Sequence, residues 1–345
     1  MTFEQIIADL EKKIFKPVYY LIGEEAYYID EISNYISDNV LNEAEKSFNQ
    51  TVLYGKDTDI NTILGIAKRF PMMSNQQVII VKEAQNIKDI DGKSNLKEGE
   101  IDPLMHYVQN PLKSTILVIC CKYKKIDGRK KIFKVLKDSA VLFESKKIYD
   151  NEVPTWISTF LNKKGISIDP VGSMMLSEYL GNDLSKIANE LTKLIITIPE
   201  NVKKITPDQI EKNIGISKEY NNFELQNALF KKDILKANRI INYFCVNQKN
   251  NPVNVTITSL YFAFSKILLY HGVADKTNNR DIASALQVNP YFINDYKIAA
   301  KNYPLSKTIK IISILREFDM RSKGVDCNDT SPETILKEMI FRILH

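Results

Sequence analysis

The sequence predicts an α/β domain with a mostly parallel sheet at the N-terminal end, followed by two all-helical domains. Three observations carry this prediction. Short apolar runs alternate with helix-period segments over the first 145 residues, helical spacing alone continues after them, and 345 residues suffice for two or three domains of ~150 residues. A composition of 44% hydrophobic and 26% charged residues is typical of a folded globular chain and excludes a mainly disordered one.

The first domain, residues 1–145, contains five apolar runs that we expect to be strands. They lie at residues 18–22, 51–54, 77–81, 115–121 and 140–143. Most are apolar at consecutive positions, as in strands covered on both faces. Residues 60–67, between the second and third runs, place apolar side chains at i, i+3, i+4 and i+7. This βαβα order predicts a parallel sheet with helices on both faces.

The strands stop after residue 145. Residues 146–213 contain the helix start and stop signals of a small helical domain. Three prolines stand where a first helical turn is expected: Pro154, Pro170 and Pro207. Two glycines follow helical patterns and should end them: Gly165 and Gly181. Thr206 begins a Thr-Pro-Asp-Gln capping box. We therefore expect short helices without a sheet in this domain.

Residues 214–345 also have helical spacing and form the expected third domain. The predicted helical segments are 223–230, 233–245, 254–271, 281–286, 290–301 and 305–318, and a last helix begins at Ser331-Pro332. No internal repeat or low-complexity tract is found in the sequence.

Charge and cysteine content exclude several classes of site. The formal net charge of +5 is mild, so a dedicated nucleic-acid binder is not indicated, although weak phosphate contact remains open. The four cysteines are Cys120, Cys121, Cys245 and Cys327; they contain no C-x-x-C pair, and only three histidines occur. A zinc site is not expected, and buried free thiols in a reducing compartment are the plain interpretation.

Catalytic and metal-binding patterns are likewise missing. The acidic cluster Asp89, Asp91, Glu98, Glu100 and Asp102 lacks regular metal-ligand spacing and is interpreted as a solvated loop. No G-x-S-x-G motif occurs. We expect no catalytic residue, no metal and no cofactor in this chain.

The sequence contains no pattern that suggests a membrane segment. No run approaches the ~20 apolar residues of a membrane span, and the N-terminus lacks a signal-peptide pattern. The expected location is the cytoplasm.

The first strand-to-helix turn is where a sheet of this type usually binds a nucleotide. A P-loop reads G-x-x-x-x-G-K-[ST], because the glycines let backbone N–H groups surround phosphate and the lysine neutralises it. Here only Gly23 is present, and residues 28–30 (Tyr-Ile-Asp) replace the second glycine, the lysine and the hydroxyl residue. Glu24 and Glu25 would repel a triphosphate and are better explained as helix-start carboxylates. ATP binding at this turn is not expected.

A basic run at residues 122–134 contains seven cations and one acid directly after a predicted strand. It could face phosphate groups. Alternatively it is a solvated helix face whose Ile132, Phe133 and Leu136 point inward, which is the commoner outcome for a charge run.

A second unusual segment is Phe70, Pro71, Met72 and Met73, where a polar connecting loop is expected. Methionine pairs are adaptable and frequent at binding surfaces. Apolar residues next to a strand are, however, more often part of the core, so both interpretations stay open.

The ordered set of these motifs resembles a known family, the delta subunit of the bacterial DNA polymerase III clamp loader, a relative of AAA+ ATPases. The matching stretches are residues 20–25, 70–74 with 77–81, 125–131, 181–191, 288–291 and 319–324. The segment 181–191 resembles the lid helix of the family and is the most specific match of the set.

The resemblance implies an AAA+/RecA-like sheet with a degenerate P-loop, a helical lid (146–213) and a helical collar (214–345). The collar would join a five-subunit ring with gamma/tau and delta-prime subunits. The chain would bind the beta sliding clamp, help to open it for loading onto primed DNA, and leave ATP hydrolysis to gamma/tau. It would be a non-catalytic subunit of the DNA-directed DNA polymerase (nucleotidyltransferase) holoenzyme.

The resemblance also assigns site residues. The clamp-binding element is Phe70, Pro71, Met72 and Met73, although many members have aromatic or leucine side chains where this chain has the methionine pair. The basic side chains expected near DNA in the assembled ring are Lys124, Lys125, Arg129 and Lys130. Two rival functions remain open: a catalytically active AAA+ ATPase and a stand-alone DNA-binding protein.

Overall fold

The computed structural model describes residues 1–92, 101–199, 202–215, 217, 219–325 and 331–345. Glu98, Glu100 and Cys327 therefore lie outside the described residues. The chain divides into two compact units, Met1–Ile148 and Tyr149–His345. The predicted division of the second part at residue 214 stays a prediction.

The first unit is built on a five-stranded parallel sheet in the order β2-β3-β4-β1-β5. The strands are β1 (Val18–Gly23), β2 (Gln50–Tyr54), β3 (Gln77–Lys82), β4 (Thr115–Lys122) and β5 (Val141–Ser145). All five predicted strands are confirmed.

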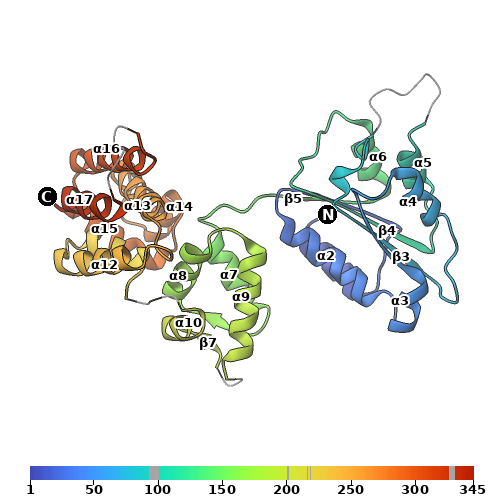
Figure 1. The fold of residues 1–345 in the computed structure, drawn as a ribbon, viewed down its shortest axis with the longest axis horizontal. Coiled ribbons are helices and arrows are strands. Elements are labelled where there is room, and N and C mark those ends of the chain that lie inside the picture. The colour runs from blue at the N-terminus through green and yellow to red at the C-terminus, as the bar shows by residue number, and fades with distance from the viewer. Residues whose placement is uncertain (93–100, 200–201, 216, 218, 326–330) are drawn as a thin grey trace. The chain divides into compact units, whose positions relative to one another are not determined.

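Helices cover both faces of this sheet (Figure 1). On one face lie α1 (Phe3–Glu11) and α2 (Ala26–Asn39); on the other lie α4 (Ile60–Ala67), α5 (Pro103–Gln109) and α6 (Lys131–Ser139). In β1, Tyr19 and Leu21 pack toward α1 and α2, whereas Tyr20 and Ile22 pack toward the opposite helices. Consecutive apolar residues are needed because successive strand side chains point to opposite faces. The short helices α3 (Glu43–Asn49) and η1 (Ala84–Asn86) complete the unit.

The second unit begins with four helices: α7 (Val153–Asn162), α8 (Pro170–Leu180), α9 (Leu184–Thr197) and α10 (Pro207–Ile214). The three prolines stand in first turns, as predicted. Gly165 and Gly181 follow the ends of α7 and α8, also as predicted, and both have positive φ. The structure adds a strand pair that the sequence did not predict: β6 (Ser167–Ile168) is parallel to β7 (Lys204–Ile205). Two-residue strands are too short to give a periodic signal.

The rest of the second unit is helical, as expected. Its elements are α11 (Asn222–Phe230), α12 (Ile234–Val246), α13 (Val253–Gly272), α14 (Asn279–Leu286), η2 (Pro290–Phe292), α15 (Ile293–Asn302), α16 (Leu305–Ser322) and α17 (Pro332–Leu344). They enclose one core that contains Phe244, Phe264 and Phe318. In the described part of the chain, α13 is the one helix that is long and apolar enough to cross a membrane. One face of α13 packs into this core, so its apolar composition has a structural explanation.

Candidate functional site

The apolar segment at residues 70–73 lies in the loop that joins α4 to β3, at the edge of the sheet where the strands begin. Its side chains are exposed: Phe70 by 76%, Met72 by 63% and Met73 by 102%. Pro71 is half-buried. The core interpretation is therefore wrong for Phe70, Met72 and Met73, because β3 and α4 fill the core without them.

The backbone of this loop is nevertheless fixed by a buried polar side chain. Asn49, at the end of α3, is only 4% exposed. Its Oδ1 accepts a hydrogen bond from the Met72 N–H at 2.6 Å, and its Nδ2 donates to the Met72 carbonyl at 2.8 Å. The next residue, Met73, has φ 54°, a left-handed conformation that costs a non-glycine residue free energy. The two hydrogen bonds from Asn49 fix the backbone of Met72, the residue directly before this left-handed position.

Three further polar side chains, Gln77, Tyr107 and Thr115, hold the start of the loop, just after α4. The Ala67 carbonyl accepts from Thr115 Oγ1 at 2.9 Å and from Tyr107 Oη at 3.2 Å. The Gln77 side-chain nitrogen donates to the Arg69 carbonyl at 2.5 Å and to Thr115 Oγ1 at 2.7 Å. Because buried polar groups are costly unless they are paired, these bonds define one loop conformation. The loop thus presents exposed apolar side chains on an ordered backbone.

Backbone groups of the turn between β1 and α2 are already hydrogen-bonded to other groups of the protein. The Glu24 N–H donates to the Ser145 carbonyl at 2.9 Å, and Ser145 Oγ donates to the Glu25 carbonyl at 2.7 Å. Glu25 caps α2, its Oε1 accepting from the Tyr27 N–H at 3.1 Å. A Cβ on Gly23 would lie 2.0 Å from the Ser145 oxygen, so the glycine serves this close approach. Two N–H groups that a phosphate cradle would use are therefore already bonded.

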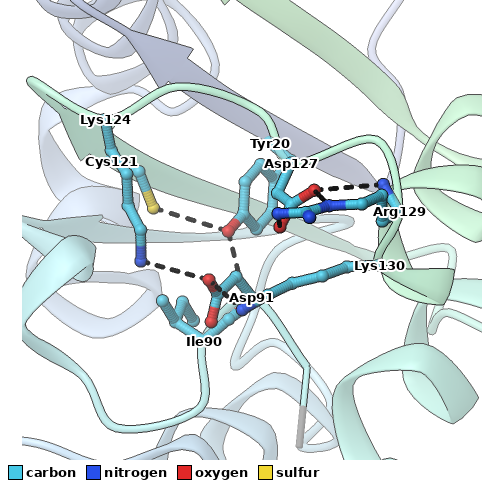
Figure 2. A network of polar contacts seen from close by, with 8 residues as sticks. All are labelled: Tyr20, Ile90, Asp91, Cys121, Lys124, Asp127, Arg129 and Lys130. Atoms are coloured by element: carbon cyan, nitrogen blue, oxygen red, sulfur yellow. Dashed lines mark hydrogen bonds and ion pairs between the residues drawn. The ribbon is translucent and has the colours of Figure 1, made fainter. Parts of the chain in front are cut away.

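Two of the four predicted DNA-proximal cations converge on one carboxylate, as Figure 2 shows. Asp91 Oδ2 lies 3.3 Å from Lys124 Nζ and 2.5 Å from Lys130 Nζ. Burial raises the pKa of Asp91, but the hydrogen bond from Lys130 and the charge of Lys124 outweigh it and leave this pKa below its usual value. Beside this cluster, Tyr20 Oη donates to the Ile90 carbonyl at 3.4 Å and accepts from Cys121 Sγ at 3.6 Å.

The other two predicted cations also have acidic partners. Lys125 Nζ lies 3.2 Å from Glu24 Oε2, and Arg129 donates to both oxygens of Asp127 at 2.9 and 3.0 Å. Ile132, Phe133 and Leu136 point inward, as the solvated-face interpretation expects. Contact of this run with DNA stays a prediction.

The structure also describes the cysteines of β4 and the side chains that could bind a metal. Burial raises the pKa of the Cys120 thiol to about 12 and that of Cys121 to about 11, so both thiols stay protonated at neutral pH. Within the described residues, no group of three His, Cys, Asp or Glu side chains could hold a metal ion.

Sequence reasoning missed Asn49, Gln77 and Thr115, which fix the loop. Asn49 is 23 residues from Met72 along the chain. A signal was available in part, because Gln77 and Thr115 are polar residues that begin otherwise apolar strands.

Comparison with solved structures first gives the class of fold. The fold is similar to that solved for the DNA clamp loader delta protein of Bacillus subtilis, with a TM-score of 0.55, 24% identity and coverage of 99% of each chain. The molecule is thus a parallel-sheet α/β protein with a helical second unit, of the architecture found in a clamp-loader subunit.

The family follows from sequence comparison. The family model described as DNA polymerase III, delta subunit matches residues 19–146. The curated DNA polymerase III subunit delta of Bacillus subtilis is 26% identical over 324 residues, which cover 94% of this chain and 92% of the relative. The chain is thus similar to the delta subunit of DNA polymerase III, as the ordered motifs predicted.

Proposed function

We propose that this clamp-loader subunit binds the beta sliding clamp through Phe70, Pro71, Met72 and Met73 and helps to hold one interface of the ring open. The observation that carries the proposal is the loop itself, whose exposed apolar side chains stand on a backbone fixed by buried hydrogen bonds. An exposed apolar cluster marks a partner site, and a pre-ordered loop lowers the entropic cost of docking.

The mechanism requires differential binding. Two or three apolar side chains would enter a pocket on the clamp and displace water, and a few such anchors carry most of the energy of an interface. The subunit can favour an open ring only if it binds the open form more tightly than the closed one. Assembly with gamma/tau and delta-prime subunits in the cytoplasm would bring the loop to a clamp that is loaded onto primed DNA.

The closed β1–α2 turn supports a role without ATP hydrolysis in this chain. The hydrogen bonds of Glu24 and Tyr27 occupy N–H groups that a triphosphate would need, and Glu25 places a carboxylate there. ATP hydrolysis would belong to gamma/tau. Titration of the isolated chain with a fluorescent ATP analogue checks this, because micromolar affinity would favour the rival ATPase function.

The direct test is the double change Met72→Ala with Met73→Ala. We expect clamp affinity to fall tens-fold or more, since loss of each anchor costs about 1–2 kcal/mol. The melting temperature should stay nearly constant, because both side chains are exposed. Isothermal titration with the cognate clamp and thermal unfolding of the same samples measure both quantities. Unchanged affinity would contradict the proposal.

A further inference from the structure

The helix that supplies Asn49 has an inverted distribution of side chains. In α3, Asn49 is the only buried residue, whereas Phe48 is 71% exposed. Helices of globular proteins normally bury their apolar residues and expose their polar ones. The buried Asn49, and not the aromatic side chain next to it, stabilises the end of α3. Packing within this unit therefore gives no reason for a phenylalanine at the exposed position 48.

Chain connectivity places Phe48 beside the apolar loop. Phe48 and Asn49 are consecutive, with Cα atoms ~3.8 Å apart, and the Asn49 side chain reaches Met72 N with Oδ1 at 2.6 Å. The Cα of Phe48 therefore lies within about 10 Å of the Met72 backbone. Consecutive helical side chains diverge by about 100°, so Phe48 does not point directly away from the side that Asn49 contacts.

We propose that Phe48 is a second anchor for the partner that binds the apolar loop, so that the clamp contacts a surface made of α3 and residues 70–73 together. The inference rests on the proposed function and extends it to a residue outside the loop. The two hydrogen bonds between Asn49 and Met72 fix the relative position of the two segments, which lets one rigid partner contact both without additional ordering.

An affinity comparison tests this surface with the full-length chain and its cognate sliding clamp. Phe48→Ala should weaken clamp binding on the order of 5- to 20-fold, the range of an aromatic anchor, with the melting temperature nearly unchanged. Phe341→Ala, which truncates a phenylalanine in α17 that is 62% exposed, is the matched control and should bind as the unaltered chain does.

The outcomes separate this inference from the proposed function. If Phe48→Ala binds normally while Met72→Ala/Met73→Ala binds weakly, the second anchor is refuted and the loop assignment stands. If the double methionine variant binds normally, the proposed function fails, and the shared surface fails with it.

A second measurement keeps the aromatic ring in place. The photoreactive amino acid p-benzoylphenylalanine, introduced at position 48, should crosslink to the clamp on irradiation, whereas the same group at position 341 should not. A crosslink only to another loader subunit, or none to the clamp, would overturn the inference.

Discussion

Asn49 fixes the proposed binding loop although it exposes almost none of its own surface. Its amide forms one hydrogen bond with the N–H and one with the carbonyl of Met72, and a third, at 3.2 Å, with the Glu45 carbonyl. The Asn49 amide thus bonds both backbone polar groups of Met72, as a neighbouring strand would do in a sheet. The exposed methionines remain ordered because the bonds act on the backbone and leave the side chains free.

Asn49→Ala should therefore weaken clamp binding several-fold without removing any atom that contacts the clamp. The loop loses two fixed hydrogen bonds, and ordering it again on docking costs free energy. Hydrogen exchange should show faster exchange of the Met72 N–H, and titration should show the affinity loss. Asn39→Ala, which removes an exposed side chain bonded to the Tyr35 carbonyl, is the control. Normal affinity together with fast exchange would show that loop order does not matter for binding.

Glu178, on α8 of the second unit, is a buried carboxyl that the proposed function does not use. Its Oε1 accepts from Gln226 Nε2 at 3.1 Å, and the same nitrogen donates to Ser259 Oγ at 2.7 Å. Burial raises the pKa of Glu178 to about 8, and the hydrogen bonds and the charge of Lys266 only partly offset it. The folded second unit therefore holds a proton that the unfolded chain releases near its ordinary carboxyl pKa.

Stability should therefore decline as the pH rises from about 5 to about 8, because the folded state binds more protons than the unfolded state over this interval. Glu178→Gln should remove this part of the pH dependence and raise the melting temperature at pH 8. Thermal unfolding at pH 5.5 and pH 8 measures the effect, with Glu333→Gln at an exposed ion pair as the control. Equal pH dependence in both variants would show that Glu178 ionises normally.

At the scale of elements, the basic run divides into two parts. Before α6, Lys124 and Lys130 both pair with Asp91, Lys125 pairs with Glu24 and Arg129 pairs with Asp127. Within α6, Lys131 and Lys134 lie on the exposed face and form no ion pair among the described residues. A phosphate backbone would thus be met more directly by α6 than by the turn before it.

Reversal of both charges, Lys131→Glu with Lys134→Glu, should weaken DNA binding by the assembled loader if the run faces DNA. Each lost phosphate contact should reduce the salt slope of binding by ~0.9. Lys124→Glu with Lys130→Glu should instead lower the melting temperature, because like charges would surround Asp91. Fluorescence anisotropy at several salt concentrations distinguishes the two. Unchanged affinity and slope in the α6 variant would identify the run as a solvated face.

At the scale of the whole molecule, the first unit contains everything that forms the proposed clamp site. The loop lies where the strands begin, and the closed β1–α2 turn lies where they end, so the two features occupy opposite edges of one parallel sheet. The side chains whose hydrogen bonds were described above for the loop are Asn49, Gln77, Tyr107 and Thr115, and all four belong to this unit. The second unit contains helices with one buried apolar face, and we predict that it joins the other loader subunits.

A chain that ends after Ile148 should consequently bind the clamp within about threefold of the full-length affinity, a difference below 1 kcal/mol. It should fail to co-purify with the other loader subunits, because the helices of residues 214–345 are predicted to join the ring. Titration and co-expression pull-down measure the two properties. Normal ring assembly by this truncated chain would contradict the assignment of the collar.

Features that depend on local spacing could be predicted from the sequence alone. Five strands and the first turns at Pro154, Pro170 and Pro207 could be predicted, because apolar periodicity and capping residues act within a few positions. The ordered motifs also predicted the similarity to DNA polymerase III delta subunits that the comparisons found. The same logic missed β6 and β7, whose two residues each carry no periodic signal.

The strand order, and the choice of apolar residues that remain exposed once the core is filled, depend on packing between distant segments. Phe48, Met72 and Met73 are as apolar as buried residues, and their exposure follows from packing of the whole first unit. The bonds from Asn49 to Met72 and from Lys130 to Asp91 join residues 23 and 39 positions apart. Such contacts form where the folded backbone brings distant segments together, so no local pattern in the sequence encodes them.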